Sequence, residues 1–180
     1  RAFIDVDGDS QWDSNEDSTL TDSNANFTLI SSQTGAIVIT TTDTTVDTLS
    51  GQKVSGLTLK APAGASVFTP MTTLLVALED SGLSASDAET TLKESFGLKS
   101  SLDLKTFDPS ENIGTNDADS VLYLNAATQI VGTLKSLSMA VSTSSSGKIS
   151  EAEVFDKGIS VLTESIKTLS EGEKLFYSQD

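Results

Sequence analysis

From Ala2 to Glu16 the sequence reads AFIDVDGDSQWDSNE, and this stretch joins a short apolar run to a dense acidic one. Phe3 and Ile4 are typical of a β-strand, because aromatic and β-branched side chains fit a pleated, half-buried surface. Five carboxylates then stand within the twelve residues from Asp5 to Glu16, and they repel one another strongly unless a cation lies between them. We therefore expect a strand that leads directly into a cation-binding loop.

The acidic residues have the spacing of calcium ligands. Counted from Asp5, carboxylates stand at positions 1, 3, 5, 9 and 12, the side-chain ligand positions of an EF-hand loop, in which position 7 binds through its backbone carbonyl. Ca²⁺ takes about six to eight oxygens in irregular geometry, whereas Mg²⁺ prefers a strict octahedron. The sequence predicts a Ca²⁺ site, and the alternative is a solvated acidic loop or a set of Asx turns. The expected ligands are Asp5, Asp7, Asp9, Gln11, Asp13 and Glu16.

Two features of the loop differ from a helix–loop–helix EF-hand. Ser10 stands at position 6, where Gly normally makes the sharp turn, and Gly8 stands at position 4. The residues before the loop are typical of a strand rather than a helix. We therefore expect EF-hand ligand geometry on a β-scaffold. Trp12 is expected to pack beneath the loop, and the alternative is a platform for stacking a sugar.

Strand-like runs continue as far as Phe68. They lie at residues 26–30, 36–40, 54–60 and 65–68, and turn residues such as Gly35, Gly51 and Pro62 separate them. Short strands with frequent turns favour a small antiparallel sheet or sandwich. We assign residues 1–68 to a calcium-binding β domain, a β-sandwich with an EF-hand-like loop.

From Thr69 the apolar pattern takes a helical period. Thr69 and Pro70 suit an N-cap and first helical position, and Ser86–Glu89 and Ser150–Glu153 have capping-box spacing. Helices are predicted from Pro70, over 86–96, over about 116–141 and over 150–169, with a last short turn from Ser170. Amphipathic helices with short connections favour a four-helix bundle-like domain over residues 69–180, so the predicted fold class is α+β.

The loop together with TDSNANFTL, Thr21 to Leu29, resembles the calcium-binding B-type repeats of bacterial surface adhesins, which are related to collagen-adhesin B-type domains. Ala25 stands where that pattern has Gly. The resemblance covers roughly the first third of the chain and implies an immunoglobulin-like β-sandwich with structural Ca²⁺, carried by Asp5, Asp7, Asp9, Asp13 and Glu16. A looser resemblance over Ala61 to Pro109 is to segments of very large secreted bacterial adhesins, in which a β-module runs into a helical one.

Composition argues against several kinds of partner and chemistry. The formal net charge is −15, so nucleic acid and anionic membrane are not expected partners, and no apolar run has transmembrane length. The chain has no Cys and no His, which makes a Zn, Cu or haem site improbable and leaves no His to activate a nucleophile. We therefore do not expect an enzyme.

The predicted function is that of a calcium-stabilised structural or adhesive module of a secreted or cell-surface bacterial protein. Its expected partners are Ca²⁺, neighbouring modules of the same large protein, and a glycan or protein on another surface. The alternative is a calcium-dependent glycan- or peptide-binding module. A calcium-dependent hydrolase is a third hypothesis, which requires a pocket with paired carboxylates.

Overall fold

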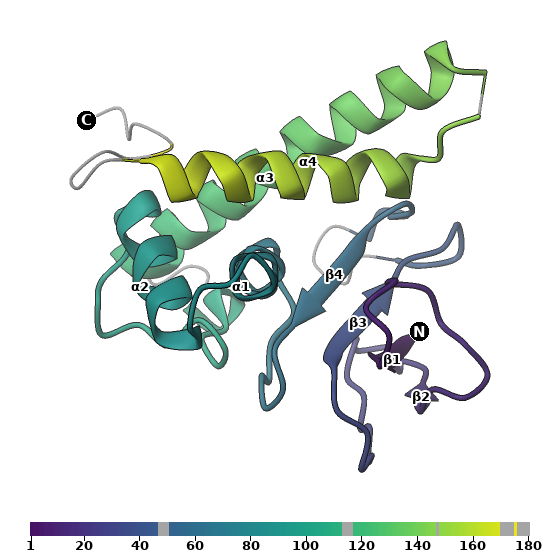
Figure 1. The fold of residues 1–180 in the computed structure, drawn as a ribbon, viewed down its shortest axis with the longest axis horizontal. Helices are drawn as coiled ribbons and strands as arrows, with labels where there is room; N and C mark the ends of the chain where they lie inside the picture. The colour runs from purple at the N-terminus through teal and green to yellow at the C-terminus, as the bar shows by residue number, and fades with distance from the viewer. Residues whose placement is uncertain (47–50, 113–116, 147, 170–174, 176–180) are drawn as a thin grey trace.

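The computed structural model describes residues 1–46, 51–112, 117–146, 148–169 and 175, and it confirms the mixed α+β class. Four antiparallel strands form one sheet, and four α-helices pack beside it; the two longest helices run across the molecule and extend above the sheet (Figure 1). The strands are β1 (Ala2–Asp5), β2 (Ser18–Thr19), β3 (Ala36–Thr40) and β4 (Thr58–Ala61). The helices are α1 (Pro70–Asp80), α2 (Ala85–Phe96), the 3-10 helix η1 (Pro109–Asn112), α3 (Ala118–Ser144) and α4 (Glu151–Thr168).

Strand β1 lies inside the sheet, whose order is β2-β1-β3-β4. Phe3 pairs with Ser18 on one side and with Val38 on the other, and the side chains of Phe3 and Val38 are fully buried. The outer edge of β4 is covered by α1, because the Lys60 N–H donates to Oγ1 of Thr73 over 3.0 Å. The residue that opens the acidic loop is therefore held at the end of a strand that is paired on both sides.

The predicted β-sandwich is not found, because all named strands of the described chain belong to one sheet. The run at 26–30 is not a strand, and Phe27 packs on Phe68 with ring centroids 5.3 Å apart. The run at 65–68 is not a strand either, since the N–H groups of Ser66 and Val67 donate to the Lys105 carbonyl. The run at 54–60 contributes only its end, to β4. Alternating apolar residues thus indicate extended segments, but only some of these segments pair with a neighbouring strand.

Most predicted helix ends are confirmed. Thr69 is the N-cap of α1 with Pro70 at its first position, and Ser150 and Glu153 form the capping box of α4. Helix α2 differs, because its N-cap is Ser84 rather than Ser86. The predicted α2 capping residue Glu89 instead accepts a hydrogen bond from the Leu104 N–H over 3.2 Å. The expected start of the long helix near Asn116 is confirmed to within two residues, since α3 begins at Ala118 with Asp117 as its N-cap. The expected turn from Ser170 lies outside the described residues.

Helix α3 follows its predicted stripe for only part of its length. Tyr123, Ile130 and Leu134 are buried as expected, but Leu137 is 49% exposed and Ser138 takes the buried position. An apolar pattern that repeats every seven residues drifts around a straight helix by about 20° per heptad, so the predicted stripe leaves the buried face near Leu137.

One cluster of buried apolar side chains joins the four α-helices and includes Leu57, which precedes β4. The helical half therefore packs directly against the sheet, while the division into domains 1–68 and 69–180 stays a prediction. No helix in the described part of the chain is long and apolar enough to cross a membrane.

Candidate metal centre

The acidic loop leaves β1 at Asp5 and enters β2 at Ser18, so it connects two adjacent strands rather than two helices. Asp5 is only 5% exposed, and its two carboxylate oxygens accept hydrogen bonds from the N–H groups of Gly8, over 2.8 Å, and Ser10, over 3.1 Å. Gly8 and Ser10 both adopt positive φ, 81° and 63°. Ser10 thus supplies the left-handed backbone conformation for which Gly is usual at that position.

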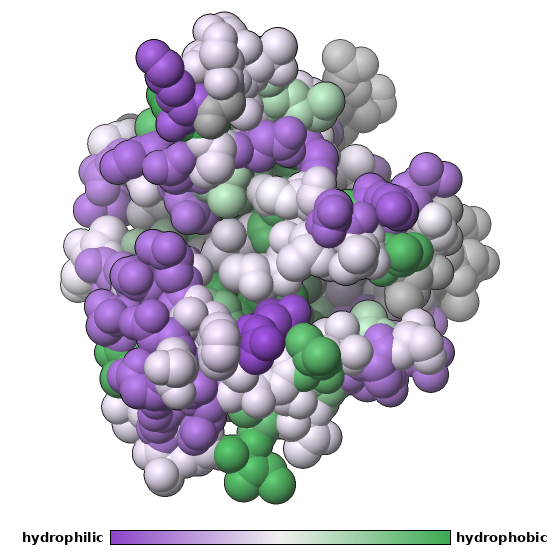
Figure 2. Space-filling model, turned by 90° about the vertical axis from the view of Figure 1, so that its right-hand side faces the viewer, coloured by the Kyte–Doolittle hydropathy of each residue, from purple (hydrophilic) through white to green (hydrophobic). Residues whose placement is uncertain are grey.

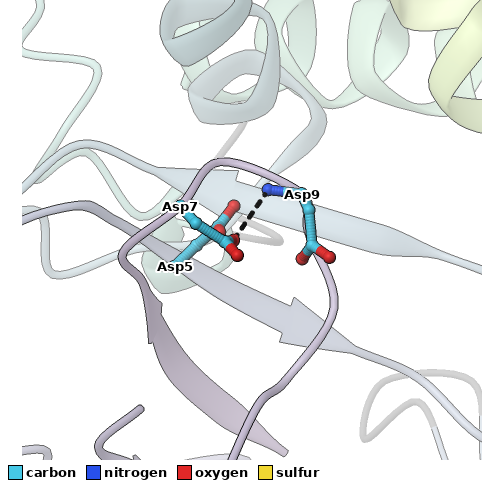
Figure 3. Close-up of side chains that lie close together, drawn as sticks. All are labelled: Asp5, Asp7 and Asp9. Atoms are coloured by element: carbon cyan, nitrogen blue, oxygen red, sulfur yellow. Dashed lines mark hydrogen bonds between the residues drawn. The ribbon is translucent and has the colours of Figure 1, made fainter. Parts of the chain in front are cut away.

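Three of the predicted ligands converge. Carboxylate oxygens of Asp5, Asp7 and Asp9 lie within 4.8 Å of one another, and Figure 3 shows these side chains within the arc of the loop. The backbone is folded around them, since the Asp9 N–H donates to Oδ1 of Asp7 over 3.3 Å and the Gln11 N–H donates to Oδ1 of Asp9 over 2.7 Å. A hard cation that prefers oxygen ligands would neutralise this concentration of negative charge.

Glu16, the last predicted ligand, closes the loop. Its side chain is buried, and its two oxygens accept hydrogen bonds from the N–H groups of Val6, over 2.8 Å, and Asp13, over 3.0 Å. Glu16 and Asp13 are not part of the converging group, and the Asp13 side chain is exposed. A carboxylate oxygen has two lone pairs, so these hydrogen bonds leave Glu16 with acceptor capacity for a cation.

Burial changes the ionisation of Asp5. Desolvation raises the pKa of its carboxyl above the ordinary value, although hydrogen bonds from Gly8 and Ser10 and the charge of Lys60 act in the opposite direction. Nearby Glu16 raises the pKa further by repulsion between like charges. The free loop therefore carries an electrostatic penalty that a bound divalent cation would relieve.

Trp12 is 42% exposed, but both its polar atom and one ring face are in use. Its indole N–H donates to the Glu16 carbonyl over 3.2 Å, and the Arg1 guanidinium lies 4.1 Å from the ring centroid. The indole is thus tied to the chain beside Glu16, but it stays exposed and is not buried beneath the loop as expected. The Arg1 contact also leaves less of the ring free to stack on a sugar.

Local spacing gave no sign of a second group that contacts the loop. Ser31 and Gln33 follow the loop by about fifteen residues, yet Oγ of Ser31 donates to Oδ2 of Asp17 over 2.7 Å and Gln33 bonds the backbone of Asn15 and Asp17. Asp17 was not among the expected ligands, and its carboxylate is engaged by Ser31. Only the turn that returns the chain along β3 brings these residues together.

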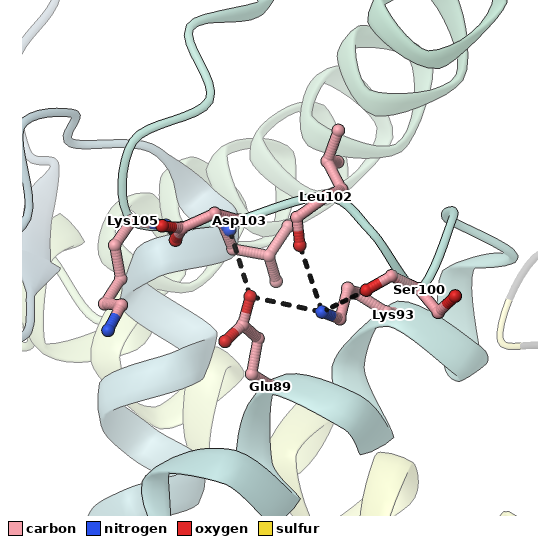
Figure 4. A network of polar contacts seen from close by, with 7 residues as sticks. Glu89, Lys93, Ser100, Leu102, Asp103 and Lys105 are labelled. Carbon is pink, nitrogen blue, oxygen red and sulfur yellow. Dashed lines mark hydrogen bonds and ion pairs between the residues drawn. The ribbon is translucent and has the colours of Figure 1, made fainter.

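Two further polar clusters lie outside the acidic loop. In the first, Lys93 donates to Oε1 of Glu89 over 3.3 Å and to the carbonyls of Ser100, over 2.9 Å, and Leu102, over 3.0 Å (Figure 4). This cluster ties the segment after α2 onto that helix, because Lys93 reaches three acceptors and Glu89 also accepts from the Leu104 N–H. Its role is therefore structural.

The second cluster lines an open groove of about 310 Å³ between β4, α1 and α4. Asp80, Asp156 and Glu164 lie along it with Lys60, and desolvation raises the pKa of Asp156 while Lys60 lowers it. The described lining contains no aromatic side chain on which a sugar ring could stack. The groove therefore lacks one feature that a glycosidase site would be expected to have.

The face of the molecule at the sheet end is mostly hydrophilic. Figure 2 views this side and shows polar residues over much of the surface, with hydrophobic residues in separate spots. Asp7, Asp9 and Asp13 of the acidic loop are themselves exposed.

Comparisons of the chain with protein-family models, with curated proteins and with solved structures gave no match.

Proposed function

We propose that this chain is a calcium-stabilised structural or adhesive module of a secreted or cell-surface bacterial protein. The observation that carries the proposal is the convergence of Asp5, Asp7 and Asp9 within 4.8 Å at the end of a paired strand. Gln11, Asp13 and Glu16 would complete the ligand set, with Gln11 binding through its carbonyl oxygen. A cation there would fix the β1–β2 connection to the sheet.

The stabilisation follows from linkage between binding and folding. The unfolded chain cannot hold the carboxylates together, so Ca²⁺ binds the folded state selectively and stabilises it. At a free concentration one hundred times the dissociation constant the gain is about 2.7 kcal/mol. Extracellular calcium modules typically bind with dissociation constants of about 10⁻⁴–10⁻³ M, and the proposed function predicts an affinity in this range.

The surface location and the adhesive role rest on composition and on the resemblance of the loop. The chain has no Cys and a net charge of −15, so calcium rather than disulfides would provide its cross-links. In such a module the ion stiffens the loop and the junction with neighbouring modules. Its role is structural, and it does not act as a signal.

Thermal melts in EDTA and in excess Ca²⁺ test the proposal. Calcium should raise the melting temperature of the wild-type chain by roughly 5–10 °C, given the linkage gain above. The double variant Asp7→Asn/Asp9→Asn should lose this shift, whereas Asp43→Asn, an exposed acid outside the loop, should keep it. Equal melting temperatures of the wild type in EDTA and Ca²⁺ would overturn the proposal.

The partial exposure of Trp12 favours one alternative, a module in which Ca²⁺ bridges a glycan or peptide ligand. This function requires an open coordination position on the ion, and it requires that the Arg1 guanidinium can move off the Trp12 ring. Titration of the calcium-loaded chain with saccharides, followed by Trp12 fluorescence, distinguishes the two functions, because a purely structural site gives no saccharide response.

A further inference from the structure

The segment Ser31–Gly35, which we call the strap, runs alongside the acidic loop and contacts it near both ends. Near the exit of the loop, Gln33 uses both atoms of its amide: Oε1 accepts from the Asp17 N–H over 2.8 Å, and Nε2 donates to the Asn15 carbonyl over 2.8 Å. These two bonds hold the backbone immediately before and after Glu16.

At the entry of the loop, Gly35 lies directly against the backbone of Asp5. A Cβ on Gly35 would overlap the Asp5 carbonyl oxygen, so the contact is as close as two backbones allow. Gly35 precedes Ala36, which pairs with Asp5 in the β1–β3 ladder. The strap is thus fixed to the strand that carries the first ligand, while Gln33 reaches the segment that carries the last one.

The strap is itself ordered by local hydrogen bonds. Oγ of Ser31 accepts from the Gln33 N–H over 2.9 Å and donates to Oδ2 of Asp17 over 2.7 Å. Gln33 is therefore presented to the loop in one orientation, with its oxygen toward Asp17 and its nitrogen toward Asn15. None of these groups belongs to the ligand set, and Gln33 contacts the backbone on both sides of Glu16.

We propose that Gln33 is a positioning residue for the calcium site, which sets the affinity for Ca²⁺ by holding Glu16 at a fixed distance from Asp5. This inference rests on the proposed calcium function. Groups that orient ligands from outside the coordination sphere typically contribute about 10–100-fold in affinity. Glu16 closes the loop over the ion, so a displacement of the backbone at Asn15 and Asp17 weakens binding without removing a ligand.

Calcium titration of the full chain by calorimetry tests the proposal. Gln33→Ala should weaken Ca²⁺ binding by roughly tenfold or more, and Gln129→Ala, an exposed glutamine on α3, should leave binding unchanged. Gln33→Glu gives the sharpest comparison. It adds negative charge near the ion, which would tighten binding if charge alone mattered, but it replaces the donor to the Asn15 carbonyl by an oxygen. Positioning predicts weaker binding.

A double-mutant cycle separates positioning from general destabilisation. In a Glu16→Gln background the Gln33→Ala change should cost little further affinity, because the ligand that Gln33 positions is already impaired. Luminescence of bound Tb³⁺ sensitised by Trp12 should fall at a fixed Tb³⁺ concentration in Gln33→Ala and recover at higher concentration. If Gln33→Ala fails to fold, Gln33→Glu and Ser31→Ala provide the same comparison.

The outcomes are distinct. A wild-type chain that does not bind Ca²⁺ would overturn the proposed function. A wild-type chain that binds, with Gln33→Ala and Gln33→Glu of equal affinity to it, would overturn the role of Gln33 and leave the calcium function intact. An equal loss from Gln33→Ala with and without Glu16 would mean that Gln33 acts only on global stability.

Discussion

The hydroxyl oxygens of Tyr123 and Thr69 lie 2.6 Å apart, and this contact joins α3 to the N-cap residue of α1. Tyr123 is fully buried, and its ring centroid lies 5.4 Å from that of Phe107. Burial raises the pKa of Tyr123 to about 12, although the hydrogen bond with Thr69 acts in the opposite direction. The folded chain therefore holds this phenol in its neutral form well above the ordinary range.

Alkaline pH should destabilise the protein through Tyr123. The pKa of Tyr123 is higher in the folded chain than in the unfolded one, so the buried neutral phenol stabilises the fold fully below pH ~10. This stabilisation is lost as the pH rises toward about 12, and the free energy of unfolding falls by about 3 kcal/mol. Tyrosinate absorbance of a Tyr177→Phe chain, in which Tyr123 is the remaining tyrosine, should titrate near 12. Tyr123→Phe should lose about 1 kcal/mol at neutral pH and remove this alkaline loss, and an unchanged alkaline melt in Tyr123→Phe would contradict the assignment.

Gly35→Ala should destabilise the sheet end of the molecule. The added methyl group would overlap the Asp5 carbonyl oxygen, and backbone cannot move aside as a flexible side chain can. Overpacking of this kind costs about 1–3 kcal/mol. Gly132→Ala is the matched control, because it adds the same methyl group to α3 with nothing within 4 Å and should stabilise by about 1 kcal/mol. Urea unfolding measures both, and equal effects would contradict the close contact.

The sequence predicted the helices better than the sheet, for a physical reason. A helix satisfies its backbone hydrogen bonds within itself, so a cap such as Thr69 and a stripe such as Leu74, Leu75 and Leu78 determine it locally. A strand makes its backbone hydrogen bonds with another strand, which comes from elsewhere in the chain. The runs at 26–30 and 36–40 are similar in composition, but only the second pairs with β1.

In the candidate site, too, the sequence predicts the local contacts but not those that depend on strand pairing. The convergence of Asp5, Asp7 and Asp9 follows from residues that are close in the sequence, so spacing was sufficient to predict it. Gln33 and Gly35 reach the loop only because β3 returns beside β1, and nothing in their local sequence indicates this. The left-handed conformation of Ser10 follows from its position in the loop, where Gly is usual, and not from its residue type.

Lys93→Met should destabilise the chain by about 2 kcal/mol, because the carbonyls of Ser100 and Leu102 would lose a charged donor in a partly buried place. Lys99→Met is the matched control. Lys99 makes an exposed ion pair with Asp119 at 2.7 Å, and pairs of that kind contribute little to stability because solvent screens them. Urea unfolding should separate the two variants, and equal losses would show that the contacts of Lys93 add nothing beyond its charge.

Ser10→Gly should stabilise the folded metal loop. Ser10 adopts φ 63°, a conformation that costs a residue with a Cβ about 1–2 kcal/mol, whereas glycine adopts it without strain. The greater entropy of glycine in the unfolded chain offsets about 0.4–1 kcal/mol of the gain. The Ser10 N–H bond to Asp5 involves only backbone and is kept.

We therefore expect Ser10→Gly to raise the free energy of unfolding by up to about 1 kcal/mol, as measured by urea unfolding, because it relieves strain in the folded loop. Gly8→Ala should have the opposite effect, because Gly8 has φ 81° and no neighbour that a methyl group could contact, so strain alone changes. A lower free energy of unfolding in Ser10→Gly would show that the hydroxyl of Ser10, and not its backbone conformation, orders the turn over Asp5.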